Sequence, residues 1–233
     1  MAFPGTTGQF VTAAEWNTML QAIGLNGVTV PGWVDAQSAW VYVSAASFKV
    51  VGADVTNRYT VGTKLSCTDA AATKYFYVVS SAYAASDTTV TITGGADYAL
   101  AGGAITNPRF SYVANPQGFP GFFNFTPGQT GWVAGVSLIT SFTVQGRACF
   151  FYYKVEGTGT GTARAITAPF IAAQVVRAPM THCYDNSAYV NTTGNYAQTN
   201  VPTSSTLTFY KTDSATWTNG NLSQVSGQIW IPI

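Results

Sequence analysis

The chain has 233 residues, of which 47% are hydrophobic, 14% aromatic and only 8% charged, and its net charge is +1. An ordinary soluble domain carries about 25% charged residues, so this chain has few charges to keep copies apart. The small net charge and the lack of a Lys/Arg cluster argue against a nucleic-acid partner, because phosphate neutralisation needs grouped cations.

The first segment, residues 1–27, predicts a short helix. Thr12-Ala13-Ala14-Glu15 has the spacing of a capping box, and Val11 precedes it as a hydrophobic staple would. The following apolar residues repeat at helical spacing: Trp16, Met19, Leu20 and Ile23. A helix of this length is marginal alone in water, so its apolar stripe needs a partner. We expect that partner to be sister chains or a larger particle, with the chain's own β domain as the alternative.

The next segment, residues 28–100, predicts a first β domain. Its short apolar or alternating runs are 39–43, 48–51, 58–61, 64–67, 74–80 and 88–93. Turn-forming residues separate these runs, as in a small antiparallel barrel or sandwich. Within 88–93 the threonines alternate with Val90 and Ile92, which predicts one wet and one buried face.

Residues 101–122 are rich in Gly and Pro and are predicted to be a linker, and residues 123–233 a C-terminal jelly-roll-like β-sandwich. The expected strands of this second domain are 136–144, 148–155, 163–168, 174–178, 206–211 and 227–231. Rings on both faces of 150–153 predict a central strand covered on both sides. The polar stretch 185–205 predicts a long exposed loop.

The sequence offers little catalytic chemistry, and we expect neither an enzyme nor a metal or cofactor site. His182 and Cys183 are neighbours on a predicted strand, so their side chains should point to opposite faces. The three cysteines, Cys67, Cys149 and Cys183, are predicted to be buried thiols. The aspartates Asp54, Asp69, Asp87 and Asp97 lie in turn-like contexts where Asp caps the backbone. The sequence contains no run of about eighteen apolar residues, so no membrane-spanning helix is predicted.

A cluster of Tyr and Asn residues in the C-terminal half could form a recognition surface. Its members are Tyr184, Asn186, Tyr189 and Tyr196. These residue types give adaptable contacts at low entropic cost, and aromatic faces can stack on sugar rings. The alternative is a polar loop anchored by its tyrosines.

The opening Gly8-Gln-Phe-Val-Thr-Ala-Ala-Glu-Trp-Asn17 resembles the start of minor virion proteins of tailed bacteriophages. The strand-like runs of the middle segment are similar to the small β modules of the same proteins. The closing Ser226-Gly-Gln-Ile-Trp230 is similar to their terminal β-sandwich strand. The resemblance implies a non-enzymatic, usually trimeric part of a tail fibre, a baseplate or a capsid decoration.

We therefore expect a structural component of a bacteriophage virion, a homotrimer that attaches by its N-terminal region to capsid or tail proteins. Its C-terminal sandwich would project outward. A receptor-binding, lectin-like tail-fibre module that contacts a host glycan is the alternative, and a polysaccharide-degrading virion enzyme the weaker one. The first residues lack the basic start and apolar core of a secretion signal, so we expect synthesis in the host cytoplasm.

Overall fold

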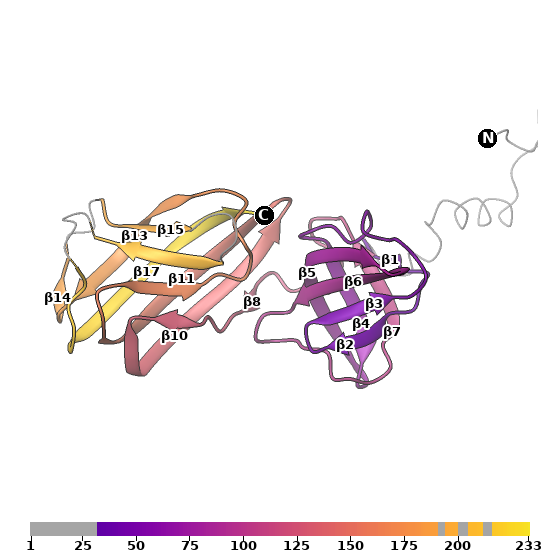
Figure 1. Ribbon diagram of the computed structural model, residues 1–233, viewed down its shortest axis with the longest axis horizontal. Coiled ribbons are helices and arrows are strands. Elements are labelled where there is room, and N and C mark those ends of the chain that lie inside the picture. The colour runs from indigo at the N-terminus through magenta and orange to yellow at the C-terminus, as the bar shows by residue number, and fades with distance from the viewer. Residues whose placement is uncertain (1–31, 191–193, 200–204, 212–215) are drawn as a thin grey trace, which may run out of the picture.

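The computed structural model describes residues 32–190, 194–199, 205–211 and 216–233. These residues form seventeen strands and no helix, which confirms the prediction of a mainly β protein. The strands make two curled antiparallel sheets that lie side by side (Figure 1). Within this described part, no helix is long and apolar enough to cross a membrane. The predicted helix, with Val11, Trp16, Met19, Leu20 and Ile23, lies outside the described residues.

The first sheet has seven strands in the order β1-β7-β4-β5-β6-β3-β2. Their bounds are β1 (Val34–Asp35), β2 (Val41–Ser44), β3 (Ser47–Val50), β4 (Lys64–Asp69), β5 (Ala72–Ala84), β6 (Asp87–Thr93) and β7 (Thr106–Ser111). Tight hairpins join β4 to β5 and β5 to β6. Three of the six strand pairs in this sheet, β2–β3, β4–β5 and β5–β6, join strands that are consecutive in the chain.

The core of the first sheet is built on aromatic rings. Trp40 stacks on Phe48 with ring centroids 4.1 Å apart, and the Trp40 indole N–H donates to the Tyr59 hydroxyl at 2.9 Å. Alternation in β6 places Val90 and Ile92 in this core, as predicted. Thr88 is buried beside them, and its hydroxyl bonds the backbone of the 53–55 segment.

Two predictions for the first half differ from the structure. Residues 58–61 form no strand; they lie in turns, and Tyr59 of this stretch is fully buried. The segment expected to be a linker contains β7, which pairs with both β1 and β4. Asn107, with φ 48°, and Pro108 lie within that strand. Because both residue types are typical of turns, the sequence does not predict a strand there.

The second sheet has ten strands in the order β8-β10-β11-β17-β13-β15-β16-β12-β9, with β14 paired to β13. Their bounds are β8 (Phe123–Asn124), β9 (Gln129–Thr130), β10 (Trp132–Gln145), β11 (Ala148–Gly159), β12 (Arg164–Thr167), β13 (Arg177–Asp185), β14 (Ala188–Tyr189), β15 (Tyr196–Thr199), β16 (Thr206–Tyr210) and β17 (Leu222–Pro232). The closing strand β17 lies between β11 and β13.

This second sheet folds over into two layers. The first residues of β13 pair with β15, whereas its later residues pair with β17. The strands β8, β10, β11, β17 and the later part of β13 form what we call the front layer, and β15, β16, β12 and β9 the back layer. Rings meet between the layers: Tyr153 lies 5.2 Å and Trp132 6.1 Å from Phe209, centroid to centroid.

Three predictions for the second half are wrong. Strand β11 has one fully buried face only, since Cys149, Phe151 and Tyr153 are inside while Tyr152 is exposed. The strand expected at 174–178 begins only at Arg177. The stretch 185–205, expected to be a loop, contributes β14 and β15.

The two sheets share an aromatic junction centred on Tyr77 of β5. Its ring lies within 6.4 Å of four others, which are Phe119, Phe123, Phe142 and Phe170. Close to it, Asn124 donates its amide and side-chain N–H groups to the Asp97 carboxylate at 2.8 and 2.9 Å. Tyr77 belongs to the core of the second sheet although its strand belongs to the first. The two β regions are therefore packed against each other through buried side chains.

Candidate interaction surfaces

The outer face of the front layer carries large apolar side chains that are exposed or, in the case of Phe150, half-buried, and we call them the outer aromatic patch. Its members are Phe122, Ile139, Phe150, Tyr152 and Trp230. Trp230 is 49% exposed and Phe122 55%, although both are large apolar side chains. Phe150 lies between them, with ring centroids 4.8 Å from Trp230 and 6.4 Å from Phe122.

Strand register gathers this patch from distant parts of the sequence. Phe150 of β11 is the direct partner of Trp230 in β17 and of Thr143 in β10. Side chains alternate along each strand, so Phe150 and Trp230 point outward while their neighbours Cys149 and Ile231 are buried. Rings on both faces of 150–153 predicted a second buried face, so the patch could not be recognised from the sequence.

A second aromatic group lies on the same outer face, toward the β13–β14 hairpin. His182 and Tyr184 stack with centroids 5.3 Å apart, and Tyr189 meets them edge-on at 5.5 and 5.9 Å. Asn186 and Ser187 form the tight turn of this hairpin with φ near +55° and +59°. The structure thus brings together three of the predicted contact residues, Tyr184, Asn186 and Tyr189, and adds His182. We call Tyr184, Tyr189 and His182 the hairpin cluster.

The fourth predicted contact residue, Tyr196, lies in the back layer. It stacks on Tyr210 at 5.1 Å, and the Arg177 guanidinium covers its ring at 5.0 Å. Tyr196 and Tyr210 line a separate hollow of about 300 Å³. A ligand held by the hairpin cluster would therefore meet a different surface from one held by Tyr196.

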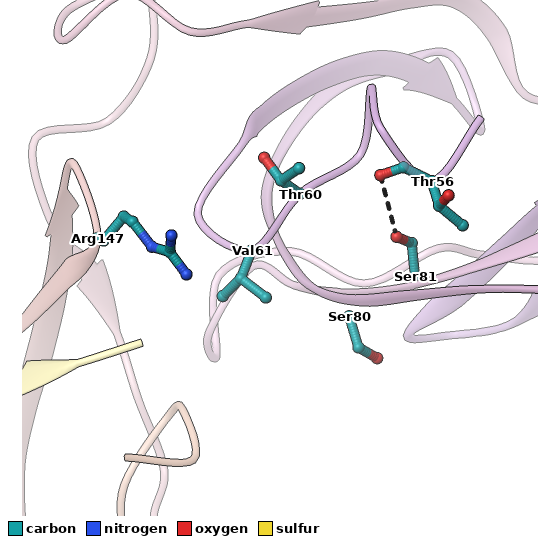
Figure 2. A pocket seen from close by; sticks show the side chains of 6 residues that line it. All are labelled: Thr56, Thr60, Val61, Ser80, Ser81 and Arg147. Atoms are coloured by element: carbon teal, nitrogen blue, oxygen red, sulfur yellow. Dashed lines mark hydrogen bonds between the residues drawn. The ribbon is translucent and has the colours of Figure 1, made fainter. Parts of the chain in front are cut away.

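An open groove lies where the turn between β10 and β11 approaches the first sheet. Figure 2 shows Arg147 of that turn facing Thr60 and Val61, with Thr56, Ser80 and Ser81 along the groove. This part of the groove measures about 440 Å³. An adjoining part of about 410 Å³ shares Thr60, Val61 and Arg147 and extends to Lys64. The two parts together are the junction groove.

His182 and the three cysteines were the residues considered for catalysis. Cys183 is fully buried while His182 faces outward, so the two side chains point apart as predicted. All three cysteines are buried thiols, as predicted, and burial together with the nearby Asp69 charge raises the pKa of Cys67 to about 12. Across the described ranges, no three His, Cys, Asp or Glu side chains gather as metal ligands would.

The four turn aspartates hold backbone, as predicted. Asp54 accepts from the Thr56 amide, Asp87 from Gly52, Asp97 from Asn124 and Asp69 from Ala101. Hydrogen bonds from Thr56 lower the pKa of Asp54. The Gly52 amide, the Lys49 ammonium bond and its charge do the same for Asp87. These carboxylates stabilise loops, and none of the four is among the described residues that line the junction groove.

Buried charges in the second sheet are also structural. Arg164 is fully buried and donates to four backbone carbonyls, those of Thr160, Gly161, Ala163 and Thr218. Its guanidinium lies over the rings of Trp132 and Trp217. Lys211 and Asp185 form a buried ion pair at 2.8 Å in the same region. This network links β12 to the segments around Asp185 and Thr218 within the second sheet.

No protein-family model, curated protein or solved structure matches the chain. The surfaces above are therefore interpreted from their own geometry.

Proposed function

We propose that the chain is a structural component of a bacteriophage virion, assembled as a homotrimer. In this proposal the N-terminal region attaches to capsid or tail proteins, and the second sheet, a jelly-roll-like sandwich, projects outward from the first, a small barrel or sandwich. The resemblance of residues 8–17 to phage virion proteins supports the virion assignment. The low charge supports self-association, because copies repel one another weakly.

The observation that carries the proposal is the outer aromatic patch. The rings of Phe122, Phe150 and Trp230 form one contiguous group at the surface, and contiguous exposed apolar groups mark interaction sites when they are large. Trp, Tyr and Phe are also the residue types enriched at the centres of protein interfaces. A second copy is the partner we assign to the patch, because Lys154 and Glu156 flank it with one charge of each sign. A face that carries both signs can meet its own copy without net repulsion.

The test is the location of the chain. Particles released from cells that carry the gene would be purified on a density gradient and digested for peptide mass spectrometry. Peptides of this chain at a constant ratio to the major capsid protein support the proposal, and the ratio separates a head decoration from a tail part. Particles that lack the chain, while it accumulates in the soluble cell fraction, overturn it.

A second candidate function, binding of a host glycan, is favoured by the hairpin cluster. Stacked His182 and Tyr184 with the exposed Tyr189 edge form an aromatic platform beside the polar Asn186. Such platforms take sugar rings on their faces and sugar hydroxyls on neighbouring amides. The test is a glycan array with the full chain and with Tyr189→Ala, where loss of binding in the variant supports this candidate. Unchanged binding by the variant, or no binding by either protein, counts against it.

A further inference from the structure

The junction groove contains a largely buried cation that has no anion beside it among the described residues. Lys64 is only 7% exposed, and its ammonium lies 5.6 Å from the Tyr77 ring and 5.7 Å from the Phe119 ring. None of the ion pairs or side-chain hydrogen bonds in the described part of the chain reaches this ammonium. Buried Lys side chains are rare unless they are paired.

The other deeply placed cations show what Lys64 lacks. Lys211 donates to Asp185 and Lys74 to Asp69, each at 2.8 Å. Arg164 donates to backbone carbonyls on every side. Lys64 instead opens into the groove, where two aromatic rings are its neighbours, and burial lowers the pKa of its ammonium.

A second cation faces the same groove from the other sheet. Arg147 leaves the β10–β11 turn, is exposed, and forms no ion pair with any described residue (Figure 2). Two cations from two sheets thus border one hollow. A carboxylate between them would accept charge-assisted hydrogen bonds from both.

The other residues that line the groove indicate what kind of molecule would carry this carboxylate. Several hydroxyl side chains line the groove, among them Thr60 and Ser80, with Val61 as an apolar contact. The Thr60 hydroxyl also lies 3.2 Å from the Thr63 hydroxyl. Each hydroxyl can donate one hydrogen bond and accept others, which suits a polyhydroxylated ligand. The volume of about 410–440 Å³ per part lies in the range of small-ligand sites.

We propose that the junction groove binds an acidic sugar, a uronic or sialic acid residue, whose carboxylate lies between Lys64 and Arg147. The sugar hydroxyls meet Thr60 and Ser80. This site is distinct from the hairpin cluster and does not rest on the virion assignment. Because the ligand touches both sheets, binding also strengthens their junction.

The experiment is a titration of the purified full chain with glucuronate and with N-acetylneuraminate, followed by amide NMR shifts or calorimetry. Glucose serves as the neutral sugar, acetate as the bare carboxylate and inorganic phosphate as a different anion. We expect a Kd of about 1 mM or tighter for at least one acidic sugar, and binding at least about tenfold weaker for glucose, acetate and phosphate.

The variants Lys64→Met and Arg147→Gln are each expected to weaken acidic-sugar binding about tenfold or more. Arg177→Gln, an exposed cation in the back layer, is the matched control and should leave it unchanged. Arg147→Gln decides alone if Lys64→Met does not fold, because Arg147 is exposed. The proposal is overturned if no acidic sugar binds, if acetate or phosphate binds as well, or if Arg147→Gln binds like the parent chain.

Discussion

The Tyr77 hydroxyl of the first sheet accepts a hydrogen bond from the Val144 amide of the second sheet at 3.2 Å. The same hydroxyl lies 3.4 Å from the Thr143 hydroxyl, and all three groups are buried. A polar contact inside an aromatic junction fixes one relative placement of the sheets, because shifting them would leave the Val144 N–H without an acceptor.

Removing that hydroxyl tests the junction. Tyr77→Phe keeps the ring but leaves the buried Val144 amide without its hydrogen-bond acceptor. We therefore expect a loss of about 1–2 kcal/mol in the free energy of unfolding. Tyr77→Ala should cost about 3–5 kcal/mol and split one calorimetric transition into two. Tyr83→Phe, an exposed tyrosine of the same strand, is the control. Equal stability of Tyr77→Phe and the parent chain would show that the junction bond is not formed.

Acid should weaken the first sheet through Asp69. Burial pushes the pKa of Asp69 up, but bonds from Lys74 and the Ala101 amide, with the Lys74 charge, outweigh this and hold the pKa below its usual value. In the unfolded chain the pKa of an aspartate carboxyl is about 3.9. The stabilisation is therefore complete above that pH and is lost as pH falls through the lower native pKa.

The measurement is urea unfolding of the parent chain and of Asp69→Asn between neutral and acidic pH. At neutral pH the variant should be less stable by about 3 kcal/mol, because it leaves Lys74 without its buried anion. The difference should shrink as the parent carboxylate is protonated. Asp87→Asn, at a pair that is more exposed than Lys74–Asp69, should change stability less. A difference that stays constant down to acidic pH would contradict the assignment.

Arg164 should be essential to the second sheet. Arg164→Met leaves four carbonyls without a donor, so we expect a loss of about 2–4 kcal/mol in unfolding free energy. Arg164→Lys should rescue little, because a single ammonium cannot reproduce the planar fork. Arg147→Met is the exposed control, expected within about 0.5 kcal/mol of the parent. The account of this network fails if Arg164→Met unfolds at the same urea concentration as that control.

The turn between β4 and β5 should gain stability from glycine. Ala70 and Ala71 both have positive φ, 51° and 61°, where a Cβ is unfavourable. Ala71→Gly should therefore raise the free energy of unfolding by about 0.5–1 kcal/mol, measured by thermal or urea unfolding. Ala84→Gly, in the neighbouring strand, is the control and should lower it. A destabilised Ala71→Gly chain would mean that this turn has another conformation.

Much of the fold follows from the sequence, because period-two alternation reports a sheet face directly. Strand β6 shows this: Val90 and Ile92 are buried as their spacing requires. Strand β7 could not be recognised, since Asn107 and Pro108 are turn residues that tertiary pairing with β4 forces into a strand. The burial of Tyr59 in a turn likewise depends on distant partners, Trp40 and Phe48.

The candidate surfaces were predictable only in part. Tyr184 and Tyr189 face each other because a two-residue turn at Asn186 closes the hairpin, a local feature of the sequence. The junction groove needs Lys64 and Arg147, which are far apart in the chain and meet only through packing of the two sheets. The exposure of Trp230 could not be predicted, because a ring in an apolar strand can point into the core or outward until the strand register is known.

We infer that copies of this chain associate through the outer aromatic patch, and sedimentation equilibrium of the purified full chain is the direct test of this association. The account predicts a homotrimer that shifts to monomer in Trp230→Gln, because truncating a central aromatic side chain typically costs an interface about 2 kcal/mol or more. Tyr83→Gln, at an exposed tyrosine of the first sheet, should remain trimeric. A parent chain that sediments as a monomer at every concentration, or a Trp230→Gln chain that stays trimeric, would contradict the account.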